Sequence, residues 1–217
     1  MDVLVDFFGG HMSEAELIST VATLMQSRQT ILPKRLMEPG PDAGQLQQIL
    51  EAAASAPDHG QILPWRFVLL PSEVRGALGQ VFATALRERD PTATPEQVQQ
   101  ARDKAHRSPC LLVVVVDAAR GDPAIDLQER IVSAGCAVQN VLLMATALGF
   151  GSALTSGKAL KSGALRALLG LQAGEQALCF VSVGTVQSNR PGRLRPRVQD
   201  YVCTLAVSST ASVPQSD

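Results

Sequence analysis

Residues 110–116 have the sequence CLLVVVV, an unbroken apolar run that decides the fold class. Seven residues are too few for a buried helix, and the four valines are β-branched, which favours a strand. Because no polar residue alternates with the apolar ones, both faces of this strand are expected to be buried. The sequence therefore predicts a central strand with other elements packed on each side.

Segments on either side of this run have apolar residues at the spacing typical of further strands and helices. Strands are expected at residues 65–70 (WRFVLL), 176–186 and 201–207. Helices are expected at residues 13–26, 44–56, 73–89, 95–106, 123–148 and 162–169. Strands and helices do not alternate regularly and no repeat is present, so we expect an α+β layered domain and not a doubly wound one.

Length and composition indicate one domain that acts on small molecules. The chain has 217 residues, 46% of them apolar and 18% charged, which suits a single core, and its net charge of −1 gives no drive toward nucleic acid or an anionic membrane. We expect a leader at residues 1–12, one domain at 13–207 and a disordered tail at 208–217. No secretory signal is visible and the four cysteines form no C-x-x-C pair, so a cytoplasmic enzyme is expected.

The longest apolar stretch, residues 131–148, is long enough to raise the question of a membrane span. Ser133, Gln139, Asn140 and Thr146 interrupt it, so burial in protein is the better interpretation. A helix that is apolar on nearly every side must be covered on nearly every side. In a chain of this size, that requirement predicts a helix shared with a second subunit, and hence a homodimer.

Several motifs that would carry chemistry fail on inspection. Gly149-Phe150-Gly151 lacks the third glycine of a dinucleotide fingerprint, and residues 151–158 (GSALTSGK) have the wrong glycine spacing for a phosphate-binding loop. The three histidines have no partners at metal-ligand spacing, so no metal is expected, and no nucleophile motif is present. We therefore expect no catalytic side chain, and either the chemistry comes from a bound cofactor or there is none.

Four segments, in this order, resemble the nitroreductase family, and the resemblance covers residues 17–207. The first is Arg28-Gln29-Thr30, followed by Lys34-Arg35, and the second is APDHGQILPW at residues 56–65. The third is GFGSALTSG at residues 149–157, and the fourth is Arg193-Leu194-Arg195. The chain departs from the family pattern at several positions: Gln29 and Thr30 stand where the family has Arg and Ser, two residues appear inserted before Lys34, Asp58 replaces a Ser and Leu63 replaces a Gln.

The resemblance implies the fold and the assembly. It implies a nitroreductase-like α+β fold, with a central mixed, mostly antiparallel sheet flanked by helices and a domain-swapped C-terminal extension. It also implies a homodimer with FMN sites at the subunit interface, so that the loop at residues 56–65 lines the flavin held mainly by the other subunit.

The resemblance also implies the cofactor contacts. Arg28 and Arg195 would bind the flavin phosphate, a task that suits the guanidinium fork. Lys34 or Arg35 would face the flavin N1/O2 edge; the inserted residues leave both open. The full set of implied FMN contacts is Arg28, Gln29, Thr30, Lys34, Ser55, His59, Gln61, Leu154, Thr155, Ser156 and Arg195.

The implied activity is hydride transfer from NAD(P)H to a small acceptor such as a nitroaromatic or quinone, by a ping-pong mechanism with hydride carried by flavin N5. Three alternatives remain: a flavin-binding or flavin-storage protein, a specialised flavin-consuming or dehalogenating family member, and a helical interaction module without cofactor. The sequence contains no feature that distinguishes NADH from NADPH or identifies the physiological acceptor.

Overall fold

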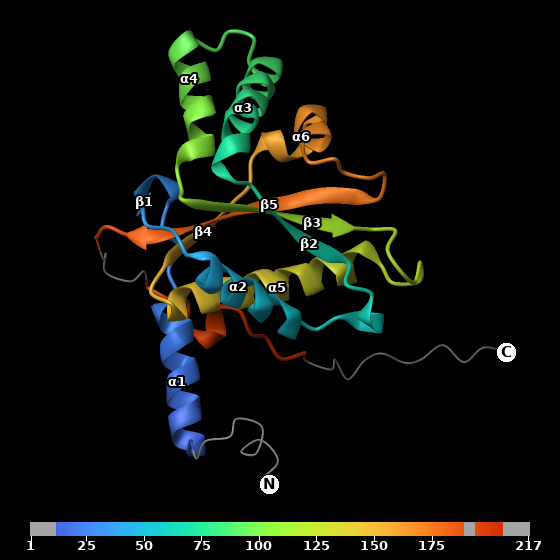
Figure 1. The fold of residues 1–217 in the computed structure, drawn as a ribbon. Coiled ribbons are helices and arrows are strands. Elements are labelled where there is room, and N and C mark those ends of the chain that lie inside the picture. The colour runs from blue at the N-terminus through green and yellow to red at the C-terminus, as the bar shows by residue number, and fades with distance from the viewer. Residues whose placement is uncertain (1–11, 189–193, 206–217) are drawn as a thin grey trace, which may run out of the picture.

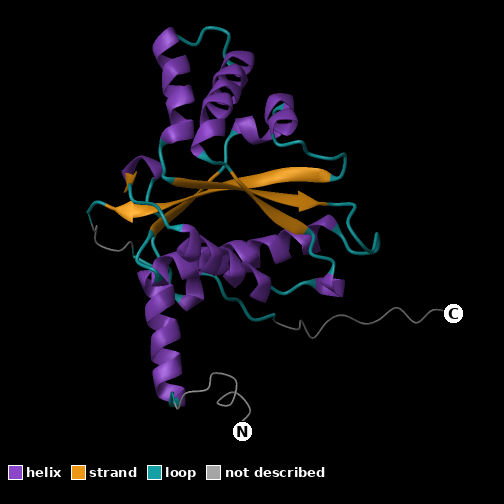
Figure 2. Ribbon diagram, viewed as in Figure 1, coloured by secondary structure: helices purple, strands orange, loops and turns teal. Residues whose placement is uncertain are grey.

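The computed structural model describes residues 12–188 and 194–205, and these form three layers. A β-sheet lies between two layers of helices (Figure 1). One face of the sheet is covered by α3 (Arg75–Arg89), α4 (Pro95–Asp103) and α6 (Gly163–Leu168). The other face is covered by α2 (Ala43–Glu51) and α5 (Leu127–Ala147), as the separation of helices and strands in Figure 2 also shows. The layered α+β prediction is confirmed.

The sheet is built almost entirely from antiparallel pairs. Its strands are β1 (Leu36–Met37), β2 (Trp65–Leu69), β3 (Cys110–Asp117), β4 (Gly151–Thr155) and β5 (Glu175–Val186). Their order is β1-β5-β3-β2, and β4 also pairs with β5. Every one of these strand pairs is antiparallel, while a single parallel bridge joins Thr30 to Ser152 in β4.

Strand β3 is the centre of the sheet, as the apolar run predicted. Alternate side chains enter two different cores, because successive residues of a strand point to opposite faces. Leu112, Val114 and Val116 pack with α5, while Leu111, Val113 and Val115 pack in the core beneath α3 and α6. All six are buried, so neither face of this strand could carry a charged residue without a large penalty.

The expected helices are present with adjusted ends. α1 is Glu14–Ser27, capped by Ser13 and Glu16 in the capping box that the sequence indicates. The expected helices at 44–56, 73–89 and 95–106 begin or end in short 3-10 turns at Ala52–Ser55, Ser72–Val74 and Lys104–His106. The expected strand at residues 201–207 is wrong for residues 201–205, which lie exposed with no strand beside them.

The long helix begins later than residue 123 because a buried arginine holds the preceding turn. Arg130 is 1% exposed, and its guanidinium donates to the carbonyl oxygens of Ile125, Asp117, Arg120 and Asp122. These bonds fix residues 117–125 as a compact loop and leave α5 to start at Leu127. By length and mean hydropathy α5 could cross a membrane. One of its faces packs on the sheet, however, which is typical of a helix in a protein core.

α1 stands apart from the three layers and projects from one corner of them (Figure 1). It has no buried residue, and its packing is against α5. The described part of the C-terminal segment, residues 194–205, returns to this corner, where Arg195 contacts the end of α1. Exchange of this segment between subunits stays a prediction. The expected tail at 208–217, residues 1–11 of the expected leader, and Arg193 lie outside the described residues.

Candidate functional site

The candidate site is built along β4, where the loop after α1 runs beside an edge of the sheet. The amide of Ile31 donates to the carbonyl oxygen of Ser152 at 2.9 Å, and Thr30 forms a bridge with Ser152. β4 follows directly from the long helix because Gly149 adopts a left-handed backbone (φ 84°), which turns the chain into the strand. The first and third family-like segments are therefore neighbours in space.

On the α5 side of β4 lies a cavity of about 240 Å³, called here the Arg28 cavity. It is lined by Arg28, Thr30, Gln139, Leu142, Ser152, Ala153 and Leu154. Ser152 is 1% exposed, and its hydroxyl has no hydrogen-bond partner within the described chain. Because a buried hydroxyl without a partner is costly, this atom is suited to receive a hydrogen bond from, or donate one to, a bound ligand.

Two arginines from distant parts of the chain meet beside this cavity, which Arg28 lines and Arg195 does not. Arg195 donates from Nη2 to the backbone carbonyl oxygen of Arg28 at 2.6 Å. Burial lowers the pKa of Arg28, and the nearby charge of Arg195 lowers it further. Within residues 12–188 and 194–205 neither guanidinium is paired with a carboxylate. Two neighbouring cations without a carboxylate partner favour an anion beside them.

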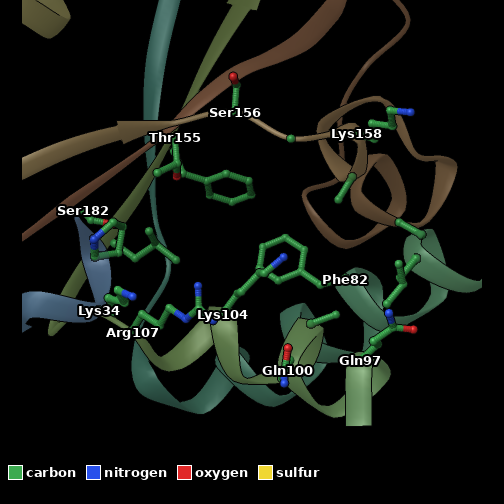
Figure 3. Close-up of a pocket in the computed structure, with 18 of the residues that line it drawn as sticks. Lys34, Phe82, Gln97, Gln100, Lys104, Arg107, Thr155, Ser156, Lys158 and Ser182 are labelled. Atoms are coloured by element: carbon green, nitrogen blue, oxygen red, sulfur yellow. The ribbon is translucent and has the colours of Figure 1, made fainter. Parts of the chain in front are cut away.

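On the opposite face of β4 lies a larger cavity of about 680 Å³, called here the Lys34 cavity. Lys34 lines it and Arg35 does not, which separates the two residues that the sequence left as alternatives. Thr155 points into the cavity, whereas Ser156, the next residue, points away (Figure 3). The strand alternation thus directs Leu154 and Thr155 to opposite sides of the same edge.

Three of the predicted site residues, Ser55, His59 and Gln61, lie away from both cavities. Nδ1 of His59 donates a 2.7 Å hydrogen bond to Oε2 of Glu129, in the first turn of α5. Gln139, which lines the Arg28 cavity, lies ten residues further along α5, or about 15 Å at the helical rise. Ser55, His59 and Gln61 are exposed, and none of them lines either cavity. Within one chain, the second family-like segment is therefore separate from the other three.

The loop that carries His59 and Gln61 has an unusual backbone. Gln61 and Leu63 have left-handed φ values of 51° and 46°, which side chains with a Cβ rarely adopt. Asp58 stabilises this path, because its Oδ2 accepts from the amide of Leu63 at 2.7 Å. Its Oδ1 is buried without a partner in the described chain. Strain held in this way is typical of functional loops.

Sequence reasoning missed several lining residues. Ser152 lies inside the family-like segment, and the strand alternation with Leu154 could have identified it. Phe82, Lys104, Arg107 and Phe180 line the Lys34 cavity, but no local signal marks them. They come together only when α3, β5 and the segment that follows α4 pack. Gln29 is half-buried between Arg28 and Thr30 and lines neither cavity.

Comparison with known proteins agrees with this arrangement. The sequence model of the Nitroreductase family matches residues 26–185, which is more than half of the chain. The matched range includes β4, the strand between the two cavities.

The chain belongs to the nitroreductase family. A relative from Haemophilus influenzae, provisionally named an NAD(P)H nitroreductase, is 36% identical over 166 residues, covering 75% of this chain and 86% of the relative. A solved nitroreductase-like protein of Bacillus cereus has the same fold, with a TM-score of 0.73 at 18% identity over 85% of this chain and 95% of that one. A nitroreductase of Desulfitobacterium hafniense, solved with bound FMN, gives a TM-score of 0.65 at 20% identity, over 85% and 97% of the two chains.

Proposed function

We propose that this nitroreductase-family protein is an FMN-dependent oxidoreductase that transfers hydride from NAD(P)H to a small acceptor such as a nitroaromatic or a quinone. The observation that carries the proposal is the contact of Arg195 with Arg28, which lines a cavity that also contains the unpartnered hydroxyl of Ser152. FMN-bound members of the fold, including the Desulfitobacterium hafniense protein, support the choice of cofactor.

The donor set at the Arg28 cavity fits the phosphate end of FMN. A phosphate offers several acceptor oxygens, and two guanidinium groups with a nearby hydroxyl can each meet one or more of them. The charges of Arg28 and Arg195 repel each other, which favours an anion between them. Thr30, held against β4 by its bridge to Ser152, would supply the hydroxyl.

The rim of β4 beside the Lys34 cavity suits a flat ring. Gly157 has open space where a side chain would begin, so a planar group can approach the backbone closely. The ammonium group of Lys34 contributes positive charge on the same side, which favours an electron-accepting ring. When bound, FMN would supply a two-electron carrier that takes hydride from NAD(P)H and delivers it to the acceptor.

The side chains of the Lys34 cavity would bind and orient the substrates and exclude water from the apolar floor. Its titratable groups are lysines and arginines together with Asp90, and the Asp90 carboxylate is engaged by the amide and hydroxyl of Thr92. We therefore assign no side chain as general acid or base, and the proton required by the reduced acceptor would come from solvent. NAD(P)H and acceptor would use one open face in turn.

The exposed apolar surface supports a dimer. Ile18, Val21 and Met25 form a stripe along α1, and Ile131 and Val132 are exposed at the start of α5. Such side chains mark an interface when they gather on one surface. A second subunit would cover them, and its loop at residues 56–65 would bring His59, Gln61 and Ser55 to the flavin site. A cytoplasmic location stays a prediction.

The visible spectrum of the purified protein tests the cofactor, and steady-state kinetics test the reaction. We expect the absorption of oxidised flavin, its loss on anaerobic addition of NAD(P)H, and parallel lines in double-reciprocal plots with a nitroaromatic or quinone acceptor. Intersecting lines would contradict a single shared site. Flavin without steady NAD(P)H oxidation would instead favour the storage alternative, and a colourless protein would contradict the proposed function altogether.

A further inference from the structure

We propose, building on the function proposed above, that the Lys34 cavity selects acceptors that carry an anionic group, through Lys104 and Arg107. The acceptor class is a planar aromatic molecule with a carboxylate or a similar anionic substituent. Neither residue belongs to the family-like segments, and neither lies on the Arg28 cavity that would hold the phosphate of FMN. Their role would therefore be recognition of the acceptor.

The first support is an excess of unpaired positive charge. Lys34, Arg89, Lys104, Arg107 and Lys158 all line the cavity, and Asp90 is the only acidic residue among its lining residues. No salt bridge of the described chain involves any of these five cations. Asp90 offsets at most one of the five charges, and its Oδ1 is held by the amide and the hydroxyl of Thr92 in the turn after α3.

The second support is the direction of the side chains. Figure 3 shows Lys104 and Arg107 pointing into the cavity from the α4 side, with Lys34 beside Arg107. Lys158 points out of the cavity in the same view. Cations at the end of a helical segment are common because they stabilise its carbonyl end. Here they meet a third cation from a different element, a convergence that helix stabilisation does not require.

The third support is the apolar wall beside these charges. Phe82 and Phe180 form an edge-to-face pair, with ring centroids 5.6 Å apart and an interplanar angle of 82°. Leu86 and Leu111 line the cavity next to them. A flat aromatic body against this wall and an anionic substituent toward Lys104 and Arg107 would satisfy both halves of the cavity. A neutral acceptor would leave the cationic half unused.

Binding of two matched probes to the oxidised protein tests the selection without turnover. The probes are 4-nitrobenzoate and 4-nitrobenzyl alcohol, which have similar size and differ in charge. Calorimetric titration of the wild type is expected to give tighter binding of nitrobenzoate, by about tenfold. The double variant Lys104→Gln, Arg107→Gln is expected to lose this difference and to bind the alcohol as before. Lys161→Gln, an exposed lysine outside the cavity, is the control.

A stopped-flow measurement of the two half-reactions distinguishes the acceptor from the dinucleotide. We expect the double variant to be reoxidised by nitrobenzoate about tenfold more slowly than the wild type, with unchanged reduction by NADH and NADPH. Slower reduction by NADPH alone would assign the anionic group to the dinucleotide phosphate and overturn the proposal. Equal weakening of both nitro compounds would also overturn it, because that result indicates a merely structural role.

The two proposals can fail separately. A protein that retains flavin but binds both probes equally refutes only the selection by Lys104 and Arg107. A colourless protein that still binds nitrobenzoate in a manner dependent on these two residues supports the anion site and refutes the flavin function.

Discussion

Arg195 and Arg28 lie 167 residues apart in the chain, yet Nη2 of Arg195 is 2.6 Å from the backbone carbonyl oxygen of Arg28. Because this bond uses the backbone carbonyl oxygen of Arg28, the guanidinium group of Arg28 is not engaged by Arg195. Both side chains can therefore bind the same anion. The contact also ties the C-terminal segment to the end of α1, so the geometry of the cavity depends on both ends of the domain.

Removal of either guanidinium should release the flavin. We expect Arg28→Met to weaken FMN binding by roughly 10- to 100-fold, since a charge-assisted hydrogen bond contributes about 1.5–3 kcal/mol. Equilibrium dialysis against FMN measures the change. Arg197→Met is the matched control, because Arg197 is exposed on the same segment and pairs with Asp200. Equal loss in both variants would argue against a phosphate site at Arg28.

Charge on the exposed apolar side chains of α1 and α5 should separate the subunits. Ile18 is 62% exposed and Val132 is 66% exposed, so Ile18→Glu and Val132→Glu leave the core of one chain intact. We expect both variants to sediment as monomers at micromolar concentration and to lose flavin, whereas Ile18→Leu stays dimeric. A wild-type protein that sediments as a monomer would refute the dimer directly.

Loss of the Arg130 guanidinium should destabilise the fold. Arg130→Met removes a buried guanidinium and leaves the carbonyl oxygens of Ile125, Asp117, Arg120 and Asp122 without their donor. We expect a decrease of roughly 3 kcal/mol in the free energy of unfolding, measured by urea denaturation. Arg87→Met, at an exposed position of α3, should change it by less than about 0.5 kcal/mol.

Acid should weaken the Arg66–Glu175 ion pair. The hydrogen bond from Arg66 lowers the pKa of Glu175, whose carboxylate lies 2.7 Å from Nε of Arg66. Because the folded-state pKa is below the unfolded value of about 4.3, the stabilisation is complete above pH 4.3 and is lost as the pH falls through the lowered pKa. We expect Glu175→Gln to cost about 2 kcal/mol at pH 7. Its unfolding free energy should then fall less steeply than that of the wild type between pH 5 and about pH 3.

Two of the cysteines should be unreactive in the folded protein. Burial raises the pKa of Cys110 and of Cys179 to about 11, with Arg75 opposing the shift at Cys110. At pH 8 only about a thousandth of each thiol is therefore ionised, and the thiolate is the reactive form. We expect a disulfide reagent to modify the exposed Cys203 rapidly and to reach Cys110 and Cys179 only on unfolding. Rapid labelling of a Cys203→Ser, Cys136→Ser variant would contradict this expectation.

The sequence predicted the layers well because local composition determined them. The apolar run at residues 110–116 could only be a strand buried on both faces, and the structure has β3 there with alternate residues in two cores. Helix ends were less accurate where tertiary contacts decide them. The start of α5 depends on Arg130 and four carbonyl groups, a relationship that no local pattern reveals.

The candidate site was predictable in part because the resemblance to the nitroreductase family marks its segments. Arg28, Thr30 and Leu154 line one cavity and Lys34 and Thr155 the other, and all lie in the family-like segments. Phe82, Lys104 and Arg107 were missed because they belong to α3 and to the segment after α4, which cover the cavity from outside those segments. His59 and Gln61 lie apart from the cavities, so their predicted role depends on a second subunit.

The position of β3 has a consequence for synthesis of the chain. Residues 110–117 pair with β2, which is made earlier, and with β5 through partners such as Cys110 and Val183, which are made later. On the ribosome, one edge of this valine-rich strand stays unpaired until about 70 further residues have been translated. A nascent chain with such an edge is open to aggregation, so recovery of native protein from cells should improve when translation is slowed or chaperones are abundant.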